Sequence, residues 1–118
     1  RELHPNSRRQ RQMCIRDSLK GEFNKNISTS IDSWSEFSPL GVVLGITPFN
    51  FPAMVPLWMF PLAIAAGNSF ILKPSEKDPL ASMFIVELFN QTKAPKGLLN
   101  LLNGDKDVVN NLIQDKRL

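Results

Sequence analysis

Between Glu36 and Lys73 the chain has no charged residue, and this uncharged segment limits what the chain can fold into. Its length alone would suit a transmembrane helix. However, prolines interrupt it, and Gly41, Gly45 and Gly67 lie where a strand–helix–strand unit would turn. We therefore expect the buried core of an α/β domain, with a membrane helix as the alternative because spanning helices tolerate proline. The interrupting prolines are Pro39, Pro48, Pro52, Pro56 and Pro61.

Short apolar runs rich in β-branched residues predict three buried strands that alternate with three helices. Short loops and nearly continuous apolar strands favour a parallel sheet, and right-handed crossovers make it one half of a doubly wound fold. The expected fold class is thus α/β, with a Rossmann-like β-α-β-α-β-α order. The strands are expected at Leu40–Ile46, Ser69–Leu72 and Leu98–Leu102.

Proline and glycine residues mark the expected ends of the helices. The first helix should begin at Pro52, kink at Pro61 and stop at Gly67. The second should be capped by Asp78, and the third by Asp105 or Asp107. The expected apolar faces comprise Leu80, Met83, Phe84 and Leu88 in the second helix, and Val108, Val109, Leu112 and Ile113 in the third.

The basic charge of the chain is confined to its first residues. Five arginines against Glu2 and Asp17 give residues 1–17 a net charge of +3, which equals that of the whole chain. We expect residues 1–18 to be a disordered and dispensable flank that resembles a translated sequencing adapter. A genuine polar flank is the alternative, and a nucleic-acid or membrane-binding tail is the less favoured one. Residues 19–39 should form an exposed strand or hairpin, and residues 40–118 a partial nucleotide-binding domain.

Two loops follow the first two expected strands, at the sheet edge where such folds bind ligands. In the first, Asn50 lies between aromatic residues and prolines, where its amide could donate to an oxyanion or cap the following helix. From the residues alone, the cap is favoured. In the second, Glu76 with Lys73 could meet ribose hydroxyls or form a solvated pair. No G-x-G-x-x-G turn is present.

Taken together, residues 46–79 (ITPFNFPAMVPLWMFPLAIAAGNSFILKPSEKDP) closely resemble the aldehyde dehydrogenase superfamily. The family pattern is P-[WF]-N-F-P, a hydrophobic helix ending in A-x-G-N, and a strand followed by K-P-[SA]-E. The resemblance runs from about Leu19 to Leu118 and includes the AP-x-G-x-LN segment at Ala94–Asn100. Phe49 in place of tryptophan, and the helix at residues 53–61, look like the methylmalonate-semialdehyde dehydrogenases.

The resemblance implies a role for each matching residue. Asn50 would donate to the oxyanion, which replaces the cap favoured above. Thr47, Pro48 and Phe49 would line the nicotinamide side of an NAD site. Lys73 and Glu76 would bind the adenosine ribose, with Ser75 and Lys77 as neighbours. No metal is implied.

The resemblance also implies an activity for the longer protein. A cysteine thiolate would attack the aldehyde, hydride would pass to NAD, and coenzyme A would take the acyl group, giving propionyl-CoA or acetyl-CoA and carbon dioxide. Cys14 matches no motif, so we expect an inactive N-terminal fragment that lacks the nucleophile. The expected enzyme is a dimer or tetramer in the cytoplasm, or in the mitochondrial matrix of a eukaryote, without nucleic acid or membrane. A non-catalytic nucleotide-binding domain and a small membrane-associated protein stay as alternatives.

Overall fold

The computed structural model describes residues 19–118, and the predictions for residues 1–18, Cys14 included, lie outside them. The chain divides into two units, with the boundary between Ser38 and Pro39.

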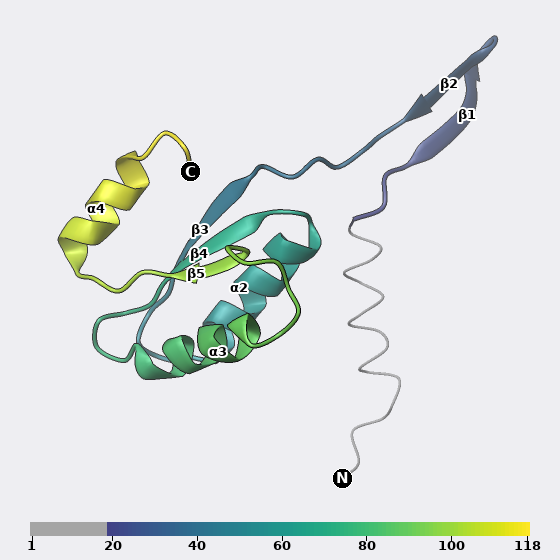
Figure 1. The fold of residues 1–118 in the computed structure, drawn as a ribbon. Helices are drawn as coiled ribbons and strands as arrows, with labels where there is room; N and C mark the ends of the chain where they lie inside the picture. The colour runs from purple at the N-terminus through teal and green to yellow at the C-terminus, as the bar shows by residue number, and fades with distance from the viewer. Residues whose placement is uncertain (1–18) are drawn as a thin grey trace. The chain divides into compact units, whose positions relative to one another are not determined.

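In the first unit, an antiparallel hairpin pairs β1 (Phe23–Ser28) with β2 (Ile31–Trp34) (Figure 1). Its ends are joined by the Ser35 amide, which donates to the Glu22 carbonyl at 2.9 Å. The hairpin lies within residues 19–39, the segment for which the sequence predicts an exposed strand or hairpin. Nearly all of its residues are exposed, including Phe23 and Trp34.

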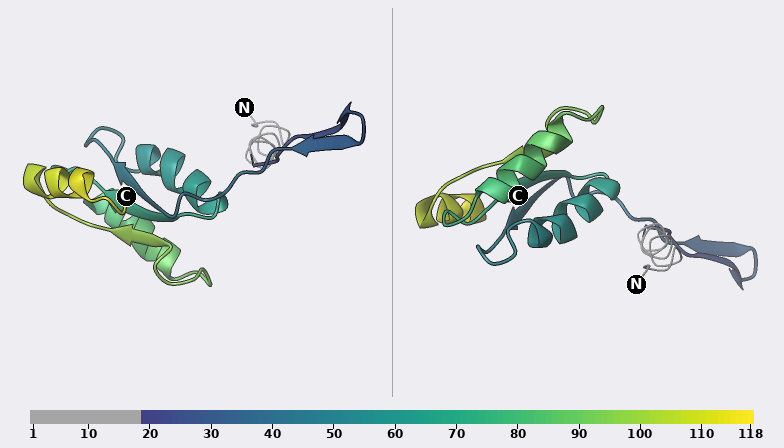
Figure 2. Two further views of the ribbon diagram at one scale, coloured as in Figure 1. Left: turned by 90° about the horizontal axis from the view of Figure 1, so that it is seen from above. Right: turned by 90° about the horizontal axis from the view of Figure 1, so that it is seen from below.

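The second unit has the predicted β-α-β-α-β-α order. Its parallel sheet has the strand order β3-β4-β5, and both crossover helices, α2 and α3, lie on one side of it (Figure 1; Figure 2 gives two further views). This arrangement confirms the predicted fold class. The bounds are β3 Val42–Ile46, α2 Met54–Ala65, β4 Ser69–Lys73, α3 Leu80–Asn90, β5 Leu99–Leu101 and α4 Lys106–Gln114.

The core lies between the sheet and the two crossover helices. Phe70 and Leu72 of β4 pack with Phe60 of α2, Val86 of α3 and Leu99 of β5. The ring of Phe60 is tilted against Phe70 and meets Phe89 edge-on, with centroids 6.3 and 6.1 Å apart. These aromatic contacts fix both helices against the central strand.

Asn68 explains the A-x-G-N motif at the end of α2. Gly67 has a φ of +90°, which lets the chain reverse there, and the amide of Asn68 bonds in two directions. Its Oδ1 accepts from the Gly41 amide at 3.0 Å, and its Nδ2 donates to the Ala63 carbonyl at 3.1 Å. The buried side chain therefore joins the end of α2 to the start of β3.

Several helix starts differ from the prediction. Asp78 does not cap α3, because Pro79 is already helical at the N-cap and its carbonyl accepts the first helical bond, from Met83. Asp105 does cap α4, accepting from the Asp107 amide at 3.1 Å. Helix α2 begins at Met54 rather than Pro52.

The first and third predicted strands are longer than those observed, whereas β4 extends one residue beyond its prediction, to Lys73. The first begins at Val42, because Gly41 has a φ of +108°, and Leu40 is 90% exposed. The third covers only Leu99–Leu101. Val42 and Ile46 are partly exposed, since the helices α2 and α3 cover only one face of the sheet.

The apolar face predicted for α3 is wrong. Leu80, Phe84 and Leu88 are exposed, whereas Ser82 and Val86 are buried and Ile85 and Phe89 pack against the core. Helix α4 follows its prediction for Val108, Val109 and Leu112, which are half-buried, while Ile113 is exposed. No helix within residues 19–118 has the length and apolarity needed to cross a membrane.

Candidate nucleotide and oxyanion site

The loops after β3 and β4 lie together at the carboxyl ends of these strands. The amide of Thr47 donates to the carbonyl of Lys73 at 3.1 Å and so continues the ladder between the two strands. The ammonium of Lys77 lies over the ring of Phe49, 4.9 Å from its centroid, which is a cation–π contact. The structure thus brings together the two segments that the sequence placed at this edge.

Within the second loop, Lys73 and Glu76 form the predicted pair. The Lys73 Nζ donates to Glu76 Oε2 at 3.4 Å, and the side chains are 3% and 57% exposed. The backbone amide of Glu76 itself, and then Lys73, hold the pKa of this carboxyl below its ordinary value. This is more than a solvated surface pair, because the lysine stem is buried while the carboxylate faces solvent.

Two further polar side chains of these loops, those of Ser75 and Thr47, differ in whether they are hydrogen-bonded. Ser75 is nearly buried, and its Oγ accepts from the Lys77 amide at 3.3 Å. Thr47 is 4% exposed, and its Oγ1 has no hydrogen-bond partner within the described residues. Pro48 and Phe49 are exposed beside it. A buried hydroxyl without a partner is unusual in a folded protein.

Asn50 is exposed, and its side chain makes no hydrogen bond within residues 19–118. Helix α2 has Ala53 at its N-cap without any side-chain cap. The alternative interpretation of Asn50 as a helix cap is therefore wrong. Its amide is left available on a loop held by the neighbouring contacts.

One buried residue near this loop was not singled out from the sequence. Ser82 of α3 is fully buried, and its Oγ donates to the Pro52 carbonyl at 2.9 Å. A sequence signal was present, because Pro52 and Pro56 are four residues apart and a helical carbonyl at Pro52 would find no amide at Pro56.

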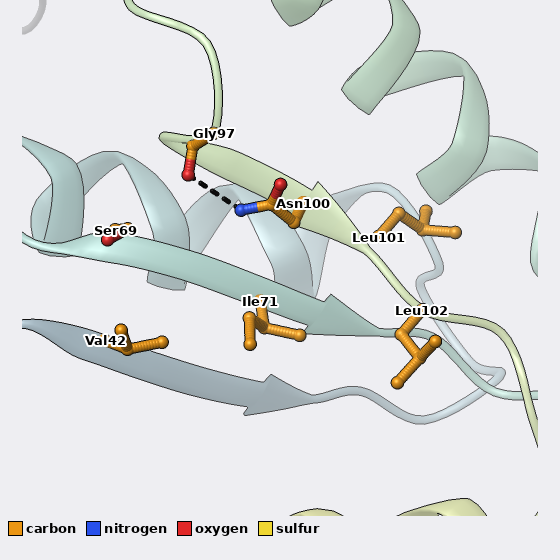
Figure 3. A pocket seen from close by; sticks show the side chains of 7 residues that line it. All are labelled: Val42, Ser69, Ile71, Gly97, Asn100, Leu101 and Leu102. Atoms are coloured by element: carbon orange, nitrogen blue, oxygen red, sulfur yellow. Dashed lines mark hydrogen bonds between the residues drawn. The ribbon is translucent and has the colours of Figure 1, made fainter. Parts of the chain in front are cut away.

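A separate hollow lies on the face of the sheet that α2 and α3 do not cover (Figure 3). Its volume is about 420 Å³, and β-strand register places Ile71 and Asn100 side by side in its wall. The Asn100 side chain donates to the Gly97 carbonyl at 2.7 Å (Figure 3). The lining is mostly aliphatic, and it holds none of the predicted site residues. It consists of Val42, Ser69, Ile71, Gly97, Asn100, Leu101 and Leu102.

Comparisons with known proteins agree with the sequence motifs. A malonate-semialdehyde dehydrogenase of Pseudomonas aeruginosa is 62% identical over 96 residues, 81% of this chain and 19% of the relative. A probable methylmalonate-semialdehyde/malonate-semialdehyde dehydrogenase [acylating], mitochondrial, of Dictyostelium discoideum is 56% identical over 92 residues, covering 78% of this chain and 17% of the relative. The chain therefore spans about a fifth of the length of the curated relatives it matches.

Solved structures show the same likeness. The methylmalonate-semialdehyde dehydrogenase of Oceanimonas doudoroffii superposes with a TM-score of 0.84 at 55% identity, covering 87% of this chain and 21% of that one. A Sinorhizobium meliloti 1021 protein, assigned as a methylmalonate-semialdehyde dehydrogenase and complexed with NAD, gives a TM-score of 0.83 at 44% identity, with 90% and 22% covered.

The model of the aldehyde dehydrogenase family matches residues 11–118. This range begins upstream of Leu19, where the motifs placed the start of the resemblance. It includes both loops, the strands that carry them and the helices that pack behind them. By this match over most of its length, the chain belongs to the aldehyde dehydrogenase family.

Proposed function

We propose that this chain supplies part of the NAD site and the oxyanion donor of an aldehyde dehydrogenase that oxidises malonate or methylmalonate semialdehyde. The observation that carries the proposal is the junction of the two loops after β3 and β4. One loop holds an unbonded asparagine amide, and the other holds the Lys73–Glu76 pair. Both loops lie at the strand ends where this class of fold binds dinucleotides.

The residues present fit the adenosine half of NAD. Lys73 has three donor hydrogens, of which the structure engages one in a long bond to Glu76. Glu76 keeps acceptor oxygens directed by that bond and exposed to solvent. A pair of this kind can donate to and accept from two ribose hydroxyls. When bound, NAD would supply the hydride acceptor.

Asn50 would act on the aldehyde rather than on NAD. When a cysteine thiolate adds to the carbonyl, negative charge develops on its oxygen, and a fixed amide donor stabilises that charge. The loop that carries Asn50 is held by the contact of Phe49 with Lys77 on one side. On the other side it is held by the hydrogen bond from Ser82 to the Pro52 carbonyl. We place the nucleophilic cysteine in the longer protein, so the chain alone should be inactive.

The acyl acceptor, the oligomeric state and the compartment of the enzyme belong to the same proposal. The Dictyostelium discoideum relative, described as acylating, supports coenzyme A as the co-substrate, which would take the acyl group from the cysteine thioester. With carbon dioxide lost along the way, the product would be acetyl-CoA from malonate semialdehyde or propionyl-CoA from the methylated substrate. We propose a homodimer or homotetramer, located in the cytoplasm or, in a eukaryote, in the mitochondrial matrix.

The test compares variants of the full-length enzyme by steady-state NADH formation with each semialdehyde, with and without coenzyme A. Asn50→Ala should lower kcat by roughly two to three orders of magnitude, as loss of one oxyanion donor does elsewhere. Glu76→Ala and Lys73→Met should instead raise KM for NAD, because ribose contacts are equally strong in ground and transition states. Methionine fills the volume of the buried lysine stem, which limits a loss of stability.

Asn100→Ala is the matched control, since Asn100 is also an exposed asparagine and lies on the other face of the sheet. It should leave kcat and KM unchanged. An Asn50→Ala enzyme with full kcat would refute the oxyanion role. Turnover of simple aldehydes but of neither semialdehyde would refute the substrate and leave the NAD site intact.

A further inference from the structure

The start of α2 contains a carbonyl that its own helix cannot satisfy. In an α-helix each carbonyl accepts from the amide four residues later. Val55 donates to Phe51 at 3.1 Å, and Leu57 donates to Ala53 at 3.4 Å. The intervening donor would be residue 56, which is proline and has no N–H. The carbonyl of Pro52 is therefore left without a helical partner.

Ser82 supplies the missing donor from another helix. Its hydroxyl lies 2.9 Å from the Pro52 carbonyl oxygen, thirty positions earlier in the chain. Ser82 has no exposed surface, so water does not compete for this bond. The first turn of α3 is thus fastened to the start of α2 at a point where the backbone has no alternative donor.

The fastened point lies two residues after Asn50. The residue between them, Phe51, has a φ of +59°, a left-handed conformation that large side chains rarely adopt. Such a conformation persists only where the surroundings hold it. On the other side of Asn50, the Thr47 amide bonds to Lys73. The loop that carries Asn50 is held at both ends, and Ser82 provides the second hold.

We propose that Ser82 is a positioning residue for Asn50: its hydroxyl replaces the amide missing at Pro56 and so fixes the turn that aims the Asn50 side chain. This inference rests on the proposed function, because it assigns Asn50 to the oxyanion. It predicts that the effect of Ser82 on catalysis passes through Asn50.

The experiment is a double-mutant cycle in the full-length enzyme. Ser82→Ala should lower kcat about ten- to a hundredfold, which is the scale of a small misplacement of a reacting group. KM for NAD should change less than threefold, since the ribose-binding pair is untouched. In an Asn50→Ala background, Ser82→Ala should cause no further loss of kcat, because the group it positions is gone. A general packing defect would lower kcat in both backgrounds.

A second substitution provides the rescue. Pro56→Ala gives residue 56 an amide that can bond to the Pro52 carbonyl, so the Ser82→Ala, Pro56→Ala double variant should regain at least half of the lost kcat on a logarithmic scale. Pro56→Ala alone should leave kcat within threefold of the unaltered enzyme. Melting temperatures are measured for each variant, because Pro56 is fully buried. A double variant that melts like Ser82→Ala but shows no rescue contradicts the proposal.

Amide hydrogen exchange keeps this inference separate from the proposed function. Faster exchange of the Val55 and Leu57 amides, which donate to the carbonyls on either side of Pro52, in Ser82→Ala would show that the hydroxyl holds the turn, whatever aldehyde the enzyme uses. Unchanged exchange would overturn the inference. If the unaltered enzyme oxidises neither semialdehyde, the proposed function fails, and the kcat cycle is run with the aldehyde that it does oxidise. Equal losses of kcat from Ser82→Ala with and without Asn50 overturn the positioning role.

Discussion

Glu76 is the residue whose charge decides how the proposed ribose site responds to acid. Its pKa lies below the ordinary value because its own backbone amide and then Lys73 stabilise the carboxylate. A lowered pKa means that the group stays ionised as pH falls through the ordinary value of 4.5. The acceptor that would bind the ribose is therefore present at every pH above that value and is lost only below it.

We accordingly predict that ionisation of Glu76 causes no change in the NAD affinity of the full-length enzyme between pH 8 and pH 5. Calorimetry measures this affinity. The affinity should fall only at lower pH, as the carboxylate is protonated. Glu76→Gln, which has an amide at every pH, should bind NAD more weakly and lack that acid-dependent fall. A loss of affinity in the unaltered enzyme that is centred above pH 5 and absent from Glu76→Gln would contradict the prediction.

At the same scale, the sequence predicted which loops lie side by side better than how each residue in them bonds. Strand ends of a parallel sheet must meet, so Thr47, Asn50 and Glu76 were placed at one edge from the pattern alone. The cation–π contact of Lys77 with Phe49 and the bond from Ser82 to Pro52 join residues far apart in sequence. No local periodicity specifies such pairs, because they depend on how the loops and α3 pack.

Among the elements, β3 is constrained by a glycine that faces the core. A Cβ on Gly45 would lie 2.3 Å from the Cζ of Phe70 and 3.2 Å from the Cε of Met59. Phe70 is 1% exposed and packs against Phe60, so its ring has little room to move. The close approach of this ring to the β3 backbone explains glycine at a strand position that otherwise favours a β-branched residue.

Gly45→Ala should therefore destabilise the protein by about 1–3 kcal/mol, the usual cost of overpacking a core. The stabilisation that alanine brings by restricting the unfolded chain is about 0.4–1 kcal/mol and does not offset this cost. The measurement is the shift of the thermal midpoint in the full-length enzyme. Phe70→Leu alone serves as the control, and adding it to Gly45→Ala should be less damaging than the two single effects combined. Strict additivity would show that the ring is not the obstacle.

The α3 helix shows why element order was easier to predict than element orientation. Apolar residues occur on two of its faces, at Leu80, Phe84 and Leu88 and at Ile85, Val86 and Phe89. Periodicity identifies both series as helical and cannot tell which one meets the sheet. The second series packs against the core, and the face that carries it also carries Ser82, which bonds to Pro52. For α2, the missing amide of Pro56 likewise explains why the regular helix begins after Pro52.

For the molecule as a whole, the two faces of the β3-β4-β5 sheet differ in how they are covered. Helices α2 and α3 cover the face that carries Phe70 and Leu72. On the other face, Val42 and Ile71 line two hollows. Leu112 of α4 borders one of them, together with residues of the segment that follows the helix. The apolar side chains on this face favour association with other chains. So do the outer edges of β3 and β5, which are unpaired within residues 19–118. The parallel order was predictable, because short loops and apolar strands allow little else.

We therefore predict that the 118-residue chain, expressed alone, is poorly soluble or molten: it should bind a hydrophobic dye and melt over a broad range. Ile71→Lys places a charge on the uncovered face and should improve solubility without lowering the melting range. Leu72→Lys is the matched control, one position along the same strand but fully buried in the core, and it should abolish folding. A sharp, cooperative melt of a dye-free monomer would contradict the prediction. It would mean that one covered face and the α2–β4–α3 core are sufficient for an independent fold.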